Sequence, residues 1–186
     1  NHGGVLALQE IARRTSTGEV IASMHRLQQR SGALARAVLQ SMPDGRCEAQ
    51  EHMDDGTMLA VAIDIKHDTA CVDFTGTDAV HAGNLNATDA IVRSVVLYVF
   101  RLLVGRRVPL NEGLLDPVDI VLPRCLLNPE WSDDPASCPA VVGGNVETSQ
   151  RLVDLMLKAL GYSAGGQGTM NNTLFGTDAF GYYETL

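Results

Sequence analysis

The first part of the chain changes from helical to strand periodicity near residue 43. Apolar residues recur at helical spacing between Val20 and Leu39, which predicts one long helix. We expect this helix to be broken or softened near Ser31-Gly32 and to end before the turn sequence Pro43-Asp44-Gly45. The pattern therefore predicts a helical N-terminal segment over residues 1–42.

Alternation of apolar and smaller or polar residues follows this turn and predicts β-strands. The alternation covers Leu59 to Ile65 and Ala70 to Phe74, on either side of a short turn at His67-Asp68. We expect a β-hairpin here, with residues 46–53 as a third strand. Residues 118–122 form a further strand candidate between two prolines.

Two more helices are predicted in the second half of the chain. Residues 86–104 are apolar on nearly every face, so we expect a helix central to the fold, with Asn86 as N-cap and Gly105 as its stop. An i, i+3, i+4 stripe over residues 152–160 predicts an amphipathic helix. These elements predict an α+β fold: a small, mostly antiparallel sheet packed with a buried central helix and further helices.

The composition is that of a globular protein with an acidic surface. The chain has 186 residues, of which 45% are hydrophobic and 19% are charged, enough to form a buried core. We expect two parts, the helical segment of residues 1–42 and an α+β domain of residues 43–186. The net charge of −8 would repel a phosphate backbone, so we expect no nucleic-acid partner.

Neither a membrane nor an oxidising compartment is indicated. The longest apolar stretch, residues 91–104, has 14 residues. A bilayer span takes ~20 residues, so we expect no membrane partner. The four cysteines form no CxxC pair, which favours reduced thiols and a cytoplasmic location.

Two segments rich in glycine and amide side chains are candidate functional segments: Gly143–Gln150 and Gln167–Asn172. The first leads into a predicted helix, where free backbone N–H groups favour an anion or a polar ligand. We take Glu147 and Asn145 as candidate catalytic residues, because the carboxylate could orient a water molecule and the amide lies at the helix start.

The candidate substrate-binding residues are other amide and hydroxyl side chains of these two segments and of the loop before residues 86–104. They are Asn84, Asn86, Thr148, Gln167, Thr169, Asn171 and Asn172. One alternative is that Asn86 and Asn145 only cap helices, although caps leave Gly143-Gly144 without a reason. Another is that the two segments lie apart, since the ends of a helix of about fifteen residues are more than ~20 Å apart.

The sequence contains no familiar nucleophile, phosphate or metal motif. There is no HExxH, Gly-x-Ser-x-Gly, P-loop or GxGxxG. His52 with Asp54 and Asp55, or Asp78 with His81, offer metal-binding side chains, but a solvated turn is the simpler interpretation of each. We expect no cofactor or metal within this chain.

Several segments, in one order along the chain, are similar to the hydantoinase B/oxoprolinase family. Besides the two candidate segments they are Val72–Thr77, Gly83–Ala87 and Gly181–Thr185. This family contains the B subunits of ATP-dependent hydantoinases, the C-terminal half of 5-oxoprolinase and the alpha subunits of acetone-type carboxylases. Its members are much longer, so the resemblance implies that this chain is an internal fragment.

The resemblance implies a hydrolase that couples ATP cleavage to the opening of a cyclic amide, a small-molecule substrate. It places ATP handling in a hydantoinase A-type partner, so ATP and a divalent metal are expected in the complete enzyme. A phosphorylated intermediate is anionic, and amide-rich helix starts suit it. Two alternatives stay open: an assembly domain that binds the A-type partner without touching substrate, and an acetone-carboxylase-like alpha subunit. A homo-oligomer is also compatible with the sequence.

Overall fold

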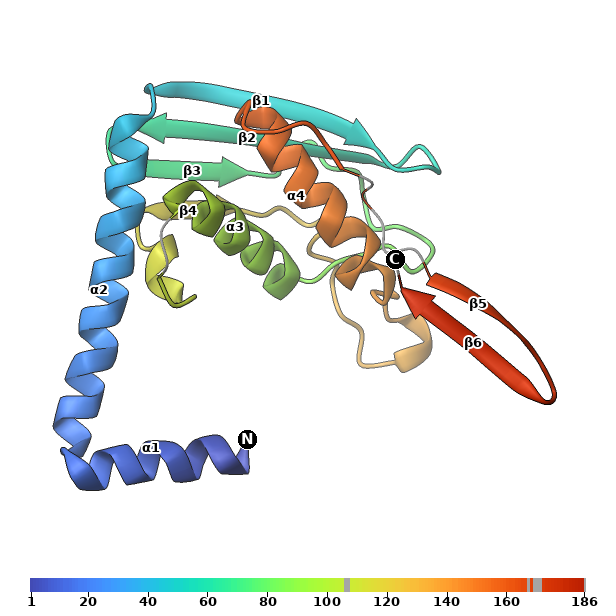
Figure 1. Cartoon of the computed structure of the whole chain (residues 1–186). Helices are drawn as coiled ribbons and strands as arrows, with labels where there is room; N and C mark the ends of the chain where they lie inside the picture. The colour runs from blue at the N-terminus through green and yellow to red at the C-terminus, as the bar shows by residue number, and fades with distance from the viewer. Residues whose placement is uncertain (106–107, 167, 169–171, 186) are drawn as a thin grey trace.

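A computed structural model of the chain describes residues 1–105, 108–166, 168 and 172–185. Figure 1 shows a sheet with two helices, α3 (Asp89–Val104) and α4 (Glu147–Ala159), on one face and a long helix, α2 (Thr17–Ser41), along one side. The predicted α+β class and the helical N-terminus are confirmed. The predicted boundary between the two parts, between residues 42 and 43, stays a prediction.

The sheet has the predicted, mostly antiparallel pairing. Its order is β1 (Gly45–His52), β2 (Met58–Lys66), β3 (Thr69–Asp73) and β4 (Val118–Val121), and only the β3–β4 pair is parallel. Most positions of β2 are buried, in keeping with its long run of aliphatic residues. The turn between β2 and β3 contains His67, whose φ of 56° is the only positive φ of a described non-glycine residue.

Helix α3 is the buried central helix that its sequence predicts. Its valines and Phe100 are buried in the core against the sheet, and Gly105 ends it with a φ of 62°. The prediction of Asn86 as its N-cap is wrong. Thr88 is the cap, with its Oγ1 accepting a hydrogen bond from the Ile91 N–H, because the Asn86 side chain is used elsewhere in the preceding loop.

Helix α4 follows a 3₁₀ turn, Gly143–Asn145, and Asn145 is not its N-cap as predicted. The cap position belongs to Val146, which is itself close to helical geometry and has no side-chain cap bond. An N-cap side chain needs an extended backbone to reach back to the first N–H groups. The 3₁₀ turn runs into α4 without such a break, so Asn145 is left exposed.

Helix α2 continues through Ser31-Gly32, so the predicted softening there is wrong. Both residues are buried. The Asn111 side chain donates a hydrogen bond to Ser31 Oγ at 2.9 Å. Gly113, in the 3₁₀ turn Glu112–Leu115, lies so close to Gln28 that a Cβ would fall 2.3 Å from the Gln28 carbonyl oxygen. The small residues therefore serve close packing at this crossing.

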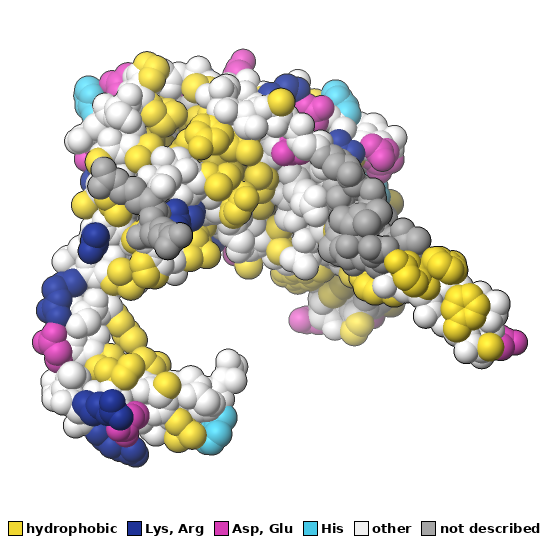
Figure 2. Space-filling model, in the orientation of Figure 1, with side chains coloured by type: hydrophobic (Ala, Val, Ile, Leu, Met, Phe, Trp, Pro, Cys, Tyr) yellow, Lys and Arg dark blue, Asp and Glu magenta, His cyan; other side chains and the backbone are white. Residues whose placement is uncertain are grey.

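Two elements project from this body. Helix α1 (His2–Arg14) has no buried residue, and Figure 2 shows apolar side chains on the inner side of the arm that it forms with the first part of α2. At the other end, the hairpin β5 (Asn172–Thr177) and β6 (Phe180–Thr185) stacks Phe175 on Tyr182 with ring centroids 4.7 Å apart.

The loop over residues 128–139 is largely exposed, as predicted, with a short 3₁₀ turn at Pro135–Ser137. Among the described helices, none is long and apolar enough to cross a membrane.

Candidate functional site

The glycine pair of the first candidate segment packs against the loop that leads into α3. The Gly143 N–H donates to the Asn84 carbonyl oxygen at 2.8 Å. A Cβ on Gly144 would lie 2.2 Å from the Asn86 carbonyl oxygen and 2.8 Å from the Ala87 Cα. Only glycine permits these two backbones to approach so closely. This close backbone contact explains why the segment contains Gly143-Gly144, which helix capping does not explain.

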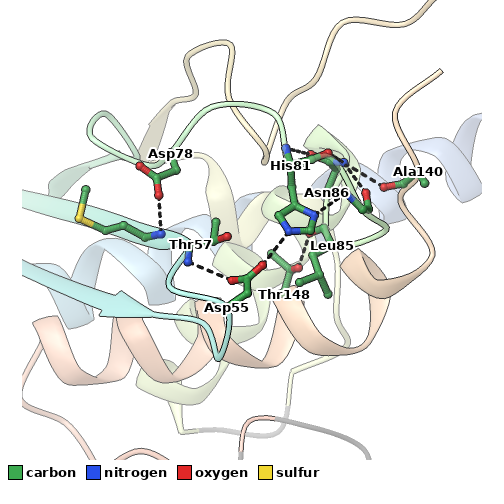
Figure 3. Close-up of polar contacts among 10 residues, drawn as sticks. Asp55, Thr57, Asp78, His81, Leu85, Asn86, Ala140 and Thr148 are labelled. Atoms are coloured by element: carbon green, nitrogen blue, oxygen red, sulfur yellow. Dashed lines mark hydrogen bonds and ion pairs between the residues drawn. The ribbon is translucent and has the colours of Figure 1, made fainter. Parts of the chain in front are cut away.

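The Asn86 side chain holds this contact together from inside. It is fully buried, and its Oδ1 accepts from the His81 N–H at 2.7 Å. Its Nδ2 donates to the carbonyl oxygens of His81, Gly83 and Ala140 at 2.9, 3.2 and 3.0 Å. Figure 3 shows these bonds converging on one amide. With these bonds the Asn86 amide holds the loop before α3 against the loop that contains Ala140. Direct contact between Asn86 and a substrate stays a prediction.

Thr148 connects the start of α4 to the same loop. Its buried hydroxyl donates to the Leu85 carbonyl oxygen at 2.6 Å. The N-terminal ends of α3 and α4 therefore lie together, and the two helices run in parallel (Figure 1). The dipoles of both helices favour negative charge at this end. We call the buried contact of residues 83–87 with residues 140–148 the loop interlock.

A histidine and an aspartate tie the β1–β2 turn to the loop interlock. His81 Nε2 lies 2.7 Å from Asp55 Oδ2, and the Gly83 N–H lies 2.9 Å from His81 Nδ1 (Figure 3). A backbone N–H can only donate, so Nδ1 accepts and the neutral ring carries its proton on Nε2, directed at Asp55. Both ring nitrogens are thus engaged within the protein.

Hydrogen bonds from Thr57 and from His81 lower the pKa of Asp55 to about 2. Nearby, the Met58 N–H donates to Asp78 at 2.7 Å, so Asp78 also serves the hairpin turn. His81 pairs with Asp55, and Asp78 bonds the hairpin turn, where the sequence favoured a solvated turn for Asp78 with His81. Across the described residues, no three His, Cys, Asp or Glu side chains gather as a metal site would require.

A groove of about 540 Å³ lies between α3 and α4. Its apolar part comes from Ile91, Val95, Tyr98 and Val153. Figure 2 shows hydrophobic side chains gathered over this part of the molecule.

The rim of the groove is polar, and all but one of its described polar side chains are uncharged. They are Ser94, Asn145, Ser149, Gln150 and Asp154. Its end nearest Asn145 lies at the shared N-terminal end of the two helices.

The chain folds back along α4 toward this groove after the helix ends. The Gly166 N–H donates to Asp154 Oδ2 at 3.0 Å, and both Gly166 and Gly168 line the groove. The first candidate segment, through Asn145, and the second, through Gly168, therefore meet at one cavity. The two segments are separated by the length of α4 in the sequence, but the chain after the helix returns along it, so they are close in space.

The two candidate catalytic residues line different cavities. Asn145 lines the groove, whereas Glu147 lines a smaller cavity of about 350 Å³ beside the β1–β2 turn. Asp54, Asp55 and Arg151 share that cavity with Glu147, and Arg151 pairs with Asp54 at 3.1 Å. The structure therefore separates the acid from the amide that the sequence grouped together.

The structure does not describe the side chains of four predicted binding residues. Gln167, Thr169 and Asn171 lie outside the described residues. Asn172 begins β5 and pairs with Thr185 in the hairpin, and its side chain is not described. Asn84 is exposed at the loop interlock. The substrate-binding assignments of all of these residues stay predictions.

The sequence reasoning missed the α3 wall of the groove and the His81–Asp55 pair. Ser94 and Tyr98 are spaced i, i+4 on a mostly apolar helix, and these two polar positions on one face were a usable signal. Asp55 and His81 are 26 residues apart, and nothing in the local sequence links them.

Comparison with known proteins agrees with this architecture. The family model for hydantoinase B/oxoprolinase matches residues 1–186, and the chain belongs to that family. It is 38% identical to 5-oxoprolinase 1 of Arabidopsis thaliana and 36% identical to the 5-oxoprolinase of Dictyostelium discoideum, over its whole length in each case. It spans only 16% and 15% of the length of those two relatives.

The fold is also found in a solved structure, the ATP-dependent caprolactamase from Pseudomonas jessenii. The TM-score is 0.70 over 90% of this chain and 29% of that chain, at 22% identity. This likeness shows the shared fold.

Proposed function

We propose that this chain is the substrate-side part of an ATP-dependent enzyme that hydrolyses cyclic amides, and that the α3–α4 groove holds the substrate or its phosphorylated form. The relatives named 5-oxoprolinase support the reaction class. The observation that carries the site is the groove itself, an apolar cavity with amide and hydroxyl groups that opens at two adjacent helix N-termini.

The parts of the groove suit the parts of such a substrate. The apolar walls pack against the ring, and Asn145 and Ser149 offer hydrogen bonds to its amide. Phosphorylation of the amide oxygen would place negative charge at the carbonyl. The positive ends of α3 and α4 would stabilise this charge without reorganisation of the protein.

ATP cleavage belongs, in this proposal, to a hydantoinase A-type partner. The described residues offer neither a phosphate-binding glycine loop nor a cluster of metal ligands. The chain's own residues bind and orient the ring, and Glu147, in the neighbouring cavity, is a less direct candidate than Asn145.

The test is phosphate release by the full protein that carries this sequence, combined with its A-type partner, ATP and hydantoin or a lactam. Asn145→Ala should lower kcat/KM by about tenfold or more, as loss of one positioned hydrogen-bonding group does. Gln29→Ala, an exposed change on α2, is the control and should leave the rate unchanged. Equal rates for the two variants would remove the groove as the substrate site.

A second candidate function, assembly with the A-type partner, is supported by the two projecting elements. On α1, Val5, Leu6, Leu8 and Ile11 are each 45–50% exposed. Exposed apolar surface of this kind is typical of protein interfaces. In an assembly-only role, Leu8→Glu would abolish complex formation, and Asn145→Ala would leave turnover intact. Product analysis with bicarbonate and a ketone tests the carboxylase alternative.

A further inference from the structure

We propose that a second cavity, beside the groove, binds the ring-opened product of a lactam, an amino acid that carries both an ammonium group and a carboxylate. This inference rests on the proposed function, because such a product arises only if the groove holds a cyclic amide that is opened. The second cavity has a volume of about 340 Å³. Its lining includes Glu51, Arg151, Asp154, Lys158 and residues 163–166, and we call it the charged cavity.

Opposite charges line the charged cavity in equal number. Arg151 and Lys158 are its cations, and Glu51 and Asp154 are its anions. A cavity with charges of a single sign attracts one end of a zwitterion and repels the other. A balanced set can offer each end of the ligand a partner of opposite charge. The charges of this cavity therefore suit a zwitterion.

Opening a lactam creates the charges that this cavity matches. Water adds across the C–N bond of the ring, so that the carbonyl carbon gains a hydroxyl group and the nitrogen gains a proton and leaves as an amine. Near pH 7 the new carboxyl group loses its proton and the new amine takes one up. A neutral ring thus becomes a zwitterion. Opening of 5-oxoproline gives a product with a second carboxylate, which the ring already carried.

Helix α4 sets the spacing of three of these charges. Arg151, Asp154 and Lys158 are three and four residues apart, the spacings that place side chains on one face of a helix. Along the axis they alternate as cation, anion and cation, at intervals of about 4.5 and 6 Å. The two ends of a four-carbon amino acid are four bonds apart, about 5 Å when extended. Its ammonium can therefore bind Asp154 while its carboxylate reaches Arg151 or Lys158.

Asp154 is the acceptor for the ammonium group. The Gly166 N–H donates to its Oδ2 at 3.0 Å and holds the side chain in place. In the part of the chain that the structure describes, no donor reaches its Oδ1. Asp154 and Gly166 line both the groove and the charged cavity. An amine released from a ring in the groove therefore forms close to this oxygen.

The two cations are paired with acids that a ligand can replace. Arg151 pairs with Asp54, whose side chain is 97% exposed. Lys158, itself exposed, pairs with Glu51 and donates to the Gln50 carbonyl oxygen at 3.3 Å. Ion pairs between exposed side chains are weak. A product carboxylate can therefore take the place of either acid, and a product with two carboxylates can use both cations.

Three small ligands test this inference: 2-pyrrolidinone, its open form 4-aminobutanoate, and butanoate, which lacks the ammonium group. Each is titrated into the isotopically labelled chain while backbone amide shifts are followed. Ala164 and Gly165 line the charged cavity and not the groove, whereas Ser94 lines the groove and not the charged cavity. We expect 4-aminobutanoate to shift the Ala164 and Gly165 amides and 2-pyrrolidinone to shift that of Ser94. Butanoate should bind the charged cavity about threefold more weakly than 4-aminobutanoate.

Two variants separate the charges that recognise the product. Lys158→Gln should weaken binding of 4-aminobutanoate by about threefold. Lys66→Gln, at the exposed end of β2, makes the same exchange away from the cavity and should not change binding. Asp154→Asn should remove the preference for 4-aminobutanoate over butanoate. Screening weakens attraction between charges, so 4-aminobutanoate should also bind more weakly as ionic strength rises.

The outcomes distinguish failure of this inference from failure of the proposed function. Equal binding of butanoate and 4-aminobutanoate by the parent chain would overturn recognition of both charges. If 4-aminobutanoate shifts the Ser94 amide but not those of Ala164 and Gly165, the product binds in the groove and the second site is overturned. Both results leave the groove as the substrate site. If 2-pyrrolidinone does not shift the Ser94 amide, the proposed function loses its site, and the product site loses its basis.

Discussion

The 3₁₀ turn Gly143–Asn145 and the first turn of α4 use the two faces of one short sequence in opposite ways. On one side, Gly144 and Thr148 are buried in the loop interlock, where the Thr148 hydroxyl donates to the Leu85 carbonyl oxygen. On the other side, Asn145 and Ser149 line an open groove. Each pair is four residues apart, the spacing that places side chains on one face of a helix.

The difference shows that the polar residues of this segment have two separate roles. Its amide and hydroxyl groups look alike in the sequence, yet burial separates those that hold the chain together from those that face a cavity. Thr148 is fully buried and donates to a backbone carbonyl, whereas Asn145 is exposed. Changes on the first face should reduce stability, and changes on the second should reduce only ligand binding.

Gly144→Ala should have the largest effect on stability. The new Cβ would lie 2.2 Å from the Asn86 carbonyl oxygen, and backbone atoms on both sides leave little room to yield. We expect the free energy of unfolding to fall by about 4 kcal/mol, above the usual range for overpacking. Urea denaturation measures it. Gly18→Ala, in the open first turn of α2, is the control and should change stability by less than about 0.5 kcal/mol.

A midpoint for Gly144→Ala close to that of the parent chain would show that the two loops can separate without cost. The interlock would then be a loose contact, and the division between the two faces of α4 would lose its basis.

Asn86→Ala should be the next most damaging change. It leaves the His81 N–H and three carbonyl oxygens without their partner in a buried setting. We expect a loss of about 3 kcal/mol in urea denaturation, because buried polar groups without hydrogen bonds are costly. The matched control is Asn84→Ala, two residues earlier, where the backbone carbonyl and not the side chain holds Gly143. Equal losses for the two variants would contradict a special role for the buried amide.

Much of the fold followed from periodicity. The alternation around His67-Asp68 identified the β2–β3 hairpin, and the apolar run over residues 86–104 identified α3. Local patterns predict such elements because burial selects residues at the period of the helix or strand. The helix caps were not predictable in this way. Asn86 has the right residue type for a cap, but a loop 54 residues further along the chain uses its side chain.

The site was only partly predictable for the same reason. Asn145 was found because its segment has an unusual composition, and the structure places it at a cavity. Its grouping with Glu147 rested on nearness in sequence, and residues two apart on a helix point in different directions. The His81–Asp55 pair depends on the fold as a whole, since the turn of one hairpin meets a loop that begins after the next strand.

The smallest expected effect concerns this pair and its dependence on pH. The pKa of Asp55 is lowered from its usual 3.8 to about 2 in the folded chain, first by the Thr57 N–H and then by His81. Because the folded pKa lies below the unfolded one, the stabilisation is complete above about pH 4 and is lost as the pH falls toward 2. The Asp55–His81 contact joins the β1–β2 hairpin turn to the loop interlock on the solvent-exposed side.

Asp55→Asn should therefore lower the urea midpoint at pH 6, and the gap between the two proteins should narrow from pH 4.5 to pH 2.5. The neighbouring Asp54→Asn is the control, because its side chain is 97% exposed and it does not touch His81. Other carboxylates also titrate in this range, so the informative quantity is the difference between variant and parent at each pH. A gap that stays constant with pH would mean that the Asp55 carboxylate contributes no charge-dependent stability.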